Sequence, residues 1–122
     1  MVLAGSSVWI DHFRGTLDGL DEMLDARSIV MHDHVLGELA LGSLRDRTET
    51  LWNLGNLPRA PLATDAEVMV FIESRRIFAR GIGYSDAHLL ASAMLGKPVT
   101  IWTKDTKLAL VAAALGVCFA GP

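Results

Sequence analysis

The sequence predicts an α/β domain of three layers, in which a central, mostly parallel sheet is flanked by helices. Short apolar segments rich in β-branched residues alternate with longer segments of helical periodicity. The chain has 122 residues, which is close to the commonest size of one domain. Parallel strands joined by helices need right-handed crossovers that cover both faces of the sheet. We therefore expect a single domain over residues 1–122, with no internal repeat.

The first third of the chain is expected to form a strand, a helix and a second strand. Residues 2–9 are apolar and partly β-branched, which predicts the first strand. Residues 16–26 are charged and amphipathic, which predicts a helix. Residues 28–31 are again typical of a strand.

The middle of the chain is expected to be helical. Apolar residues recur at helical spacing after Asp33, which suits the N-cap or the first turn. A second, polar helix is predicted over residues 47–54, before a break at residues 55–58. Thr64 begins the sequence pattern of a capping box, and we expect its helix to continue to Gly81.

The last third repeats the alternation of helix and strand. A strongly apolar helix is predicted over residues 85–96, and a β-branched strand over residues 98–102. A further helix is expected over residues 105–116, followed by a last short strand at residues 117–119. The two segments would complete the parallel sheet.

Composition excludes several classes of protein. Hydrophobic residues make up 51% of the chain, which excludes intrinsic disorder and leaves apolar surface for a partner or a second copy. The formal net charge is −3, so nucleic acid could be bound only through a local basic patch. The single cysteine, Cys118, lies among apolar residues and is expected to be a buried thiol in a reducing compartment. No signal peptide or membrane span is recognisable, which indicates a cytoplasmic protein.

Three acidic residues are candidates for chemistry, because ligands of parallel sheets bind at the carboxyl ends of the strands. They are Glu38, which has apolar neighbours, Asp86, at the start of an apolar helix, and Asp105, just after a strand. A structural interpretation also stands for each of them. Asp86 and Asp105 could offset a helix dipole, worth about 0.3–1 kcal/mol each, and Glu38 could point outward from its helix.

Other candidate sites have less support in the sequence. The four histidines lack zinc-ligand spacing, and His32 and His34, two residues apart, would point to opposite faces of a strand, so we expect surface or structural roles. Arg75, Arg76 and Arg80 are expected to cluster on one helix. This cluster is either a rim that contacts phosphates or a solvated face.

Four segments, taken in order along the chain, resemble the PIN-domain toxins of the VapC type. The resemblance implies an acidic cluster that binds Mg²⁺ or Mn²⁺ and cuts RNA, a VapB-type antitoxin that blocks this site, and a homodimer. Carried over residue by residue, it assigns Glu38, Asp86 and Asp105 to catalysis and metal binding, with Ser6 and Thr103 as supporting polar groups. The segments are VLAGSSVWID at 2–11, VLGEL at 35–39, YSDAHLLASA at 84–93 and WTKD at 102–105, in which Lys104 joins the three arginines as a candidate RNA contact.

The chain departs from the family's pattern at one position. Where the family carries an aspartate at the end of the first strand, this chain has Gly5. Because glycine has no side chain with which to bind a metal ion, we expect weakened Mg²⁺ binding and an impaired nuclease. Gly5 also keeps a second interpretation open, in which the chain is a catalytically silent PIN-fold module that binds antitoxin or RNA.

Overall fold

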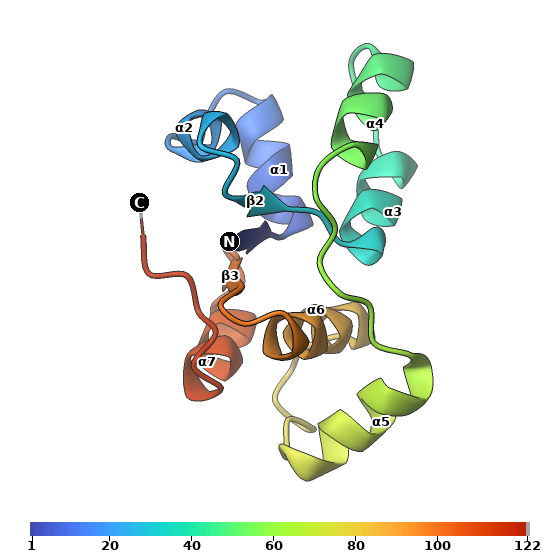
Figure 1. Ribbon diagram of the computed structural model, residues 1–122, viewed down its shortest axis with the longest axis vertical. Helices are drawn as coiled ribbons and strands as arrows, with labels where there is room; N and C mark the ends of the chain where they lie inside the picture. The colour runs from blue at the N-terminus through green and yellow to red at the C-terminus, as the bar shows by residue number, and fades with distance from the viewer. Residues whose placement is uncertain (122) are drawn as a thin grey trace.

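The computed structural model describes residues 1–121 and has a parallel sheet of three strands flanked by helices (Figure 1). The strand order is β2-β1-β3, with β1 (Val2–Ala4) between β2 (Ile29–Val30) and β3 (Thr100–Trp102). In register, Val2 lies opposite Ile29 on one side and Thr100 on the other. The α/β prediction is therefore confirmed.

Helices cover the sheet on both sides. In Figure 1, α1 and α2 lie above the strands, α6 and α7 lie below them, and α5 packs on the outside of α6. The α3–α4 pair projects at the side, where α3 contacts both α1 and α6. The helices are α1 (Ser6–Phe13), α2 (Leu20–Asp25), α3 (Asp33–Leu41), α4 (Arg47–Gly55), α5 (Asp65–Ser74), α6 (Tyr84–Leu95) and α7 (Thr106–Ala114).

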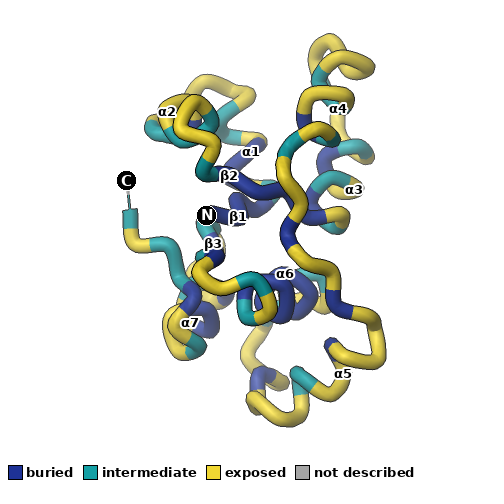
Figure 2. Tube along the Cα trace, in the orientation of Figure 1, coloured by how far each residue is buried: buried dark blue, intermediate teal, exposed yellow. Residues whose placement is uncertain are grey.

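The core runs through the sheet and α6. All three residues of β1 are buried, which explains its uninterrupted apolar sequence. Residues 87–93 of α6 are buried as well, and most of α6 is dark blue in Figure 2. The buried residues include the polar His88 and Ser92. An α6 that is buried along most of its length gives the rest of the fold a rigid element, and its N-terminal end carries Asp86.

The prediction of a strand over residues 2–9 is wrong beyond Ala4. Gly5 is the N-cap of α1, and its carbonyl oxygen accepts hydrogen bonds from the amides of Val8 and Trp9. The apolar run therefore spans two elements, and its second half is the buried face of a helix. The predicted helix over 16–26 is likewise shorter, because the left-handed Gly19 (φ 100°) precedes α2.

The predicted helix from Thr64 to Gly81 begins as expected and ends early. The capping box of Thr64 and Glu67 is present, which confirms the start. The helix ends at Ser74, because Arg76 adopts a left-handed conformation (φ 55°) and the chain turns to bury Ile77. The three arginines consequently do not share a helix.

The predicted last strand, residues 117–119, is reduced to a single parallel bridge between Cys118 and Ile101 of β3. Cys118 is half-buried, so the thiol is less enclosed than its apolar neighbours suggested. Within residues 1–121, no helix is both long and apolar enough to cross a membrane.

Candidate active site

Gly5 and Thr103 follow neighbouring strands at the carboxyl edge of the sheet. The Gly5 amide donates a hydrogen bond to the Trp102 carbonyl oxygen (2.9 Å), and Ala4 lies opposite Trp102 in the register. Paired strands lie about 4.8 Å apart, so Gly5 is next to the loop that carries Asp105. Ser6 is the first residue of α1 and is half-buried beside Gly5.

Asp105 is exposed and is the N-cap of α7. Its Oδ1 accepts hydrogen bonds from the amides of Lys107 (2.9 Å) and Leu108 (3.3 Å), while its own amide donates to Thr103 Oγ1 (3.1 Å). Within residues 1–121, Oδ2 of Asp105 has no hydrogen-bond partner. One oxygen therefore caps the helix and the other is available to a ligand, so the structural and functional interpretations are compatible.

Asp86, like Asp105, uses one carboxylate oxygen for a capping hydrogen bond. It lies in the first turn of α6, where its Oδ2 accepts a hydrogen bond from the Gly83 amide (3.0 Å). The Lys107 side chain packs against the backbone of Gly81, just before α6. This contact joins the loop that leads to Asp86 to the first turn of α7, so Asp86 and Asp105 lie at the same end of the fold.

Glu38 lies on α3, one turn after the part of that helix that contacts the start of α6. Four residues before it, His34 Nδ1 lies 2.9 Å from Ser85 Oγ, which places the start of α3 against the start of α6. Residues i and i+4 share a helix face, so Glu38 lies on the face of α3 that carries His34. Its carboxylate is exposed and lines a groove of about 780 Å³ together with Ile10 and Phe13 of α1.

These carboxylates have the right chemistry for Mg²⁺ without forming a closed cage. Within residues 1–121, no three Asp, Glu, His or Cys side chains come close enough to hold one metal ion. Mg²⁺ prefers oxygen ligands and is commonly held by one or two carboxylates, with waters and substrate phosphates completing the shell. Within residues 1–121, Asp86 and Asp105 each keep one carboxylate oxygen without a hydrogen-bond partner, and such oxygens are the ligands that an open Mg²⁺ site would need.

The backbone does not require glycine at position 5. Gly5 has φ −73° and ψ 167°, an extended conformation that any residue adopts. A Cβ atom there would lie 3.6 Å from the Trp102 carbonyl oxygen, which is an ordinary van der Waals contact. A Cβ atom therefore fits at this position, and aspartate is a favoured N-cap residue for a helix such as α1.

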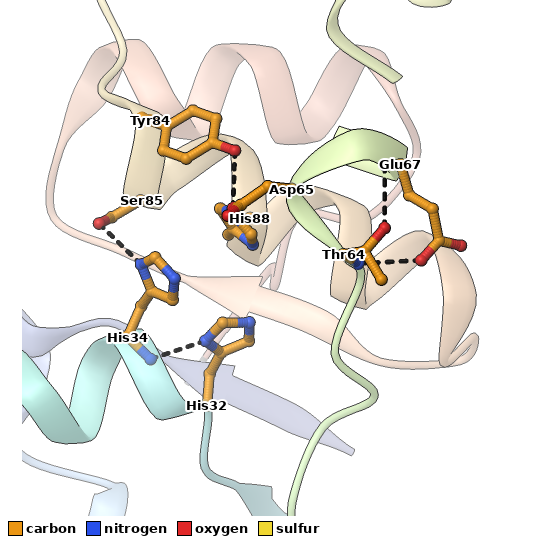
Figure 3. Close-up of polar contacts among 8 residues, drawn as sticks. All are labelled: His32, His34, Thr64, Asp65, Glu67, Tyr84, Ser85 and His88. Atoms are coloured by element: carbon orange, nitrogen blue, oxygen red, sulfur yellow. Dashed lines mark hydrogen bonds and ion pairs between the residues drawn. The ribbon is translucent and has the colours of Figure 1, made fainter. Parts of the chain in front are cut away.

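Three histidines meet where the start of α3 faces α6, which the sequence did not lead us to expect (Figure 3). The ring of His34 stacks on His88 with centroids 4.3 Å apart, and the centroids of His32 and His34 are 5.4 Å apart. The prediction that His32 and His34 do not converge was wrong, because His32 is the N-cap of α3 and His34 lies in its first turn. No local pattern could reveal the contact with His88, which is distant in sequence.

His32 is completely buried. Its Nδ1 accepts a hydrogen bond from the His34 amide (3.0 Å), while Nε2 has no partner within residues 1–121. Burial, followed by repulsion from His34, lowers the pKa of His32 to about 4. The ring is therefore neutral at physiological pH and caps the helix that carries Glu38.

Asp65, at the start of α5, is bound by two residues of α6. Its Oδ1 accepts hydrogen bonds from Tyr84 Oη (2.8 Å) and from His88 Nε2 (2.9 Å) (Figure 3). The hydrogen bond from Tyr84 and then that from His88 lower the pKa of Asp65, and the same bond raises the pKa of Tyr84. These contacts fix the start of α5 beside Asp86.

The candidate RNA-binding residues lie at different places. Arg75, Arg76 and Arg80 are exposed, and Arg75 lines a groove with Leu95 at the far end of α6 from Asp86. At 1.5 Å rise per residue, that separation is about 13 Å along the helix axis. Lys104 is close to the carboxyl edge of the sheet, where its ammonium pairs with Asp11 of α1.

Comparison with known proteins identifies the family. The chain is 39% identical over 120 residues to Ribonuclease VapC32 of Mycobacterium tuberculosis strain ATCC 25618 / H37Rv, covering 98% of this chain and 97% of that protein. Ribonuclease VapC32 of strain CDC 1551 / Oshkosh matches to the same extent. No family model matches the sequence. A parallel α/β fold with acidic residues at the carboxyl edge of its sheet, together with this similarity over nearly the whole length, shows that the chain belongs to the VapC family of PIN-domain ribonuclease toxins.

Proposed function

We propose that the chain is a Mg²⁺- or Mn²⁺-dependent endoribonuclease toxin of a toxin–antitoxin pair, impaired by Gly5. Membership of a ribonuclease family supports the activity. The position of Gly5 is the observation that supports the proposed impairment. Gly5 comes directly after β1 and lies beside the loop that bears Thr103 and Asp105.

Asp86, Asp105 and Glu38 would hold the metal ion in this proposal. A bound divalent cation neutralises charge on a phosphate and lowers the pKa of a water molecule that can attack it. The capping bonds of Asp86 and Asp105 use one oxygen of each carboxylate, so the second oxygen would be the metal ligand. Thr103 supports Asp105 through its hydroxyl, and Ser6 is the polar group nearest in sequence to the missing acid.

Gly5 accounts for a large loss of activity. Loss of a residue that only supports a metal ligand typically reduces affinity or activity 10–100-fold. Loss of a ligand itself should exceed that range, because no side chain replaces it. The remaining carboxylates then depend on water and the RNA phosphate to complete the metal's coordination.

The substrate and partner follow from the family. RNA (tRNA, rRNA or mRNA) would be held by exposed basic residues, for which Arg75, Arg76, Arg80 and Lys104 are the candidates. A VapB-type antitoxin would act in the cytoplasm by covering the groove between α1 and α3–α4, because this groove contains Glu38 beside the apolar side chains of Ile10 and Phe13.

Self-association is a further part of the proposal. Exposed apolar side chains on α5 and α6 offer a surface for a homodimer, since apolar area left in water favours association. These residues are Met69, Val70 and Leu95.

The second candidate function is a catalytically silent module that binds antitoxin or RNA, and Gly5 is the observation that favours it. The two are separated by measuring RNA cleavage with Mg²⁺ or Mn²⁺ for this chain, for Gly5→Asp, and for Gly5→Asp combined with Asp86→Asn. The proposal predicts cleavage by Gly5→Asp alone, with the double variant excluding a contaminating nuclease. If Gly5→Asp cuts none of tRNA, rRNA and mRNA, the silent module is the better account.

A further inference from the structure

Asp11 and Lys104 form an ion pair beside the candidate active site. The pair joins the last turn of α1 to the loop between β3 and α7, although the two residues are 93 positions apart in the sequence. The side chain of Asp11 is only 18% exposed, whereas that of Lys104 is 52% exposed. A mostly buried carboxylate is costly without a partner, so this pair matters more than an ion pair between two exposed side chains.

Asp11 lies on a part of α1 that other contacts hold in place. Two residues before it, Trp9 is buried in the core. The carbonyl oxygen of Asp11 accepts hydrogen bonds from the Thr16 amide (3.0 Å) and from the Thr16 hydroxyl (3.2 Å). The end of α1 is therefore fixed without the help of Lys104.

The loop on the other side of the pair is short and carries part of the candidate site. Residues 103–105 lie between the end of β3 and the start of α7. Just before the loop, the Trp102 carbonyl oxygen accepts a hydrogen bond from the Gly5 amide (2.9 Å). Gly5 is the N-cap of α1, about 9 Å from Asp11 along the helix axis at a rise of about 1.5 Å per residue. The chain around Asp105 is therefore attached to α1 at two separate points.

We propose that Asp11 is a positioning residue for the metal site and that it acts through its ion pair with Lys104. The pair holds the loop against α1 and thereby fixes the Asp105 carboxylate relative to residue 5. This inference rests on the proposed function, in which Asp105 binds the metal ion. A metal site binds its ion tightly when the ligands are already held in place, and residues that support a ligand typically contribute about 10–100-fold in affinity.

Positioning and charge alone predict opposite effects for Lys104. An ammonium group near a cation site repels the ion, so charge alone predicts that Lys104→Gln binds the ion more tightly. Loss of the ion pair releases the loop, so positioning predicts that the same variant binds the ion more weakly. Asp11→Asn weakens binding in both accounts, which makes Lys104→Gln the decisive variant.

The test is a titration with Mn²⁺ in the absence of RNA, followed by electron paramagnetic resonance. It is made for the original chain and for Gly5→Asp, in which the site would be complete. In each, Asp11→Asn and Lys104→Gln should both weaken Mn²⁺ binding by about 10-fold, the lower end of the range for supporting residues. The two substitutions together should cost no more than either alone, because both remove the same contact. Lys104→Arg keeps a positive charge for Asp11 and should retain most of the affinity.

Lys97→Gln is the matched control for the loss of one positive charge. Lys97 is exposed and follows the C-terminal end of α6, whose other end carries Asp86. Its substitution should leave the affinity for Mn²⁺ unchanged. Circular dichroism establishes a temperature at which every variant is fully folded, so that a loss of affinity is not a loss of fold.

Two results would overturn the inference and leave the proposed metal site intact. One is tighter or unchanged Mn²⁺ binding by Lys104→Gln. The other is a double variant whose loss is the sum of the two single losses, because the two residues would then act independently. If neither the original chain nor Gly5→Asp binds Mn²⁺, the proposed metal site and the inference fail together.

Discussion

The buried His32 should make this protein lose stability in mild acid. Its pKa is about 4 in the folded protein against 6.5 for an unperturbed histidine, because burial disfavours the charged ring and the nearby His34, His88 and Arg59 add repulsion that Asp33 only partly offsets. The unfolded chain therefore takes up a proton at a pH where the folded chain does not. The contribution of His32 to the free energy of unfolding is complete above pH 6.5. It decreases as the pH falls, by about 3 kcal/mol at pH 4.

The matched variant is His32→Asn, which keeps an N-cap acceptor for α3 and removes the titrating ring. Urea denaturation followed by circular dichroism at pH 7 and pH 4.5 gives four free energies of unfolding. The original chain should lose about 2.5 kcal/mol more than the variant between the two pH values. Carboxylates titrate in both chains, so the difference between the chains is the measured quantity. An equal loss in both would refute the assignment of His32 as a neutral buried cap.

Two further predictions, each with a second variant for comparison, test local features of the fold. Gly81→Ala should lower the free energy of unfolding by about 1–2 kcal/mol through its left-handed backbone. Gly116→Ala, also left-handed, should cost a similar amount, because the exposed Lys107 side chain that the new methyl group meets at position 81 can move aside. Thr64→Ala should destabilise the protein by about 1 kcal/mol, because the Glu67 amide loses its capping oxygen, and Thr64→Ser should restore most of that loss in a thermal unfolding experiment.

Periodicity predicted the long elements well and their ends less well. The buried helix α6 was found because residues 87–93 are almost all apolar, and Gly96 marks its end as expected. The end of α5 was missed because no glycine or proline marks it, and an arginine takes the left-handed conformation instead. The start of α1 was missed because one apolar run serves both β1 and the helix, although a glycine followed by two serines at positions 5–7 was a usable signal for a helix start.

The candidate site was predicted only in part, because some of its contacts join segments that are distant in sequence. Acidic residues at the ends of strands and the starts of helices can be recognised locally, and Asp86 and Asp105 became candidates in this way; their role in metal binding stays a prediction. The contacts of His34 with Ser85 and of Asp65 with His88 join distant segments, so they depend on how α3, α5 and α6 pack. These contacts therefore cannot be predicted from the local sequence pattern.

The most direct test of the account is the affinity for Mn²⁺ of three chains: the original, Gly5→Asp and Gly5→Ala. Gly5→Ala is the matched control, because its Cβ meets the same Trp102 carbonyl oxygen without adding a ligand. Electron paramagnetic resonance titration measures the free ion directly. If Gly5 occupies the place of a missing metal ligand, Gly5→Asp should bind Mn²⁺ at least about 10-fold more tightly than the other two. Equal affinities for all three chains would contradict the placement of the metal site at this edge of the sheet.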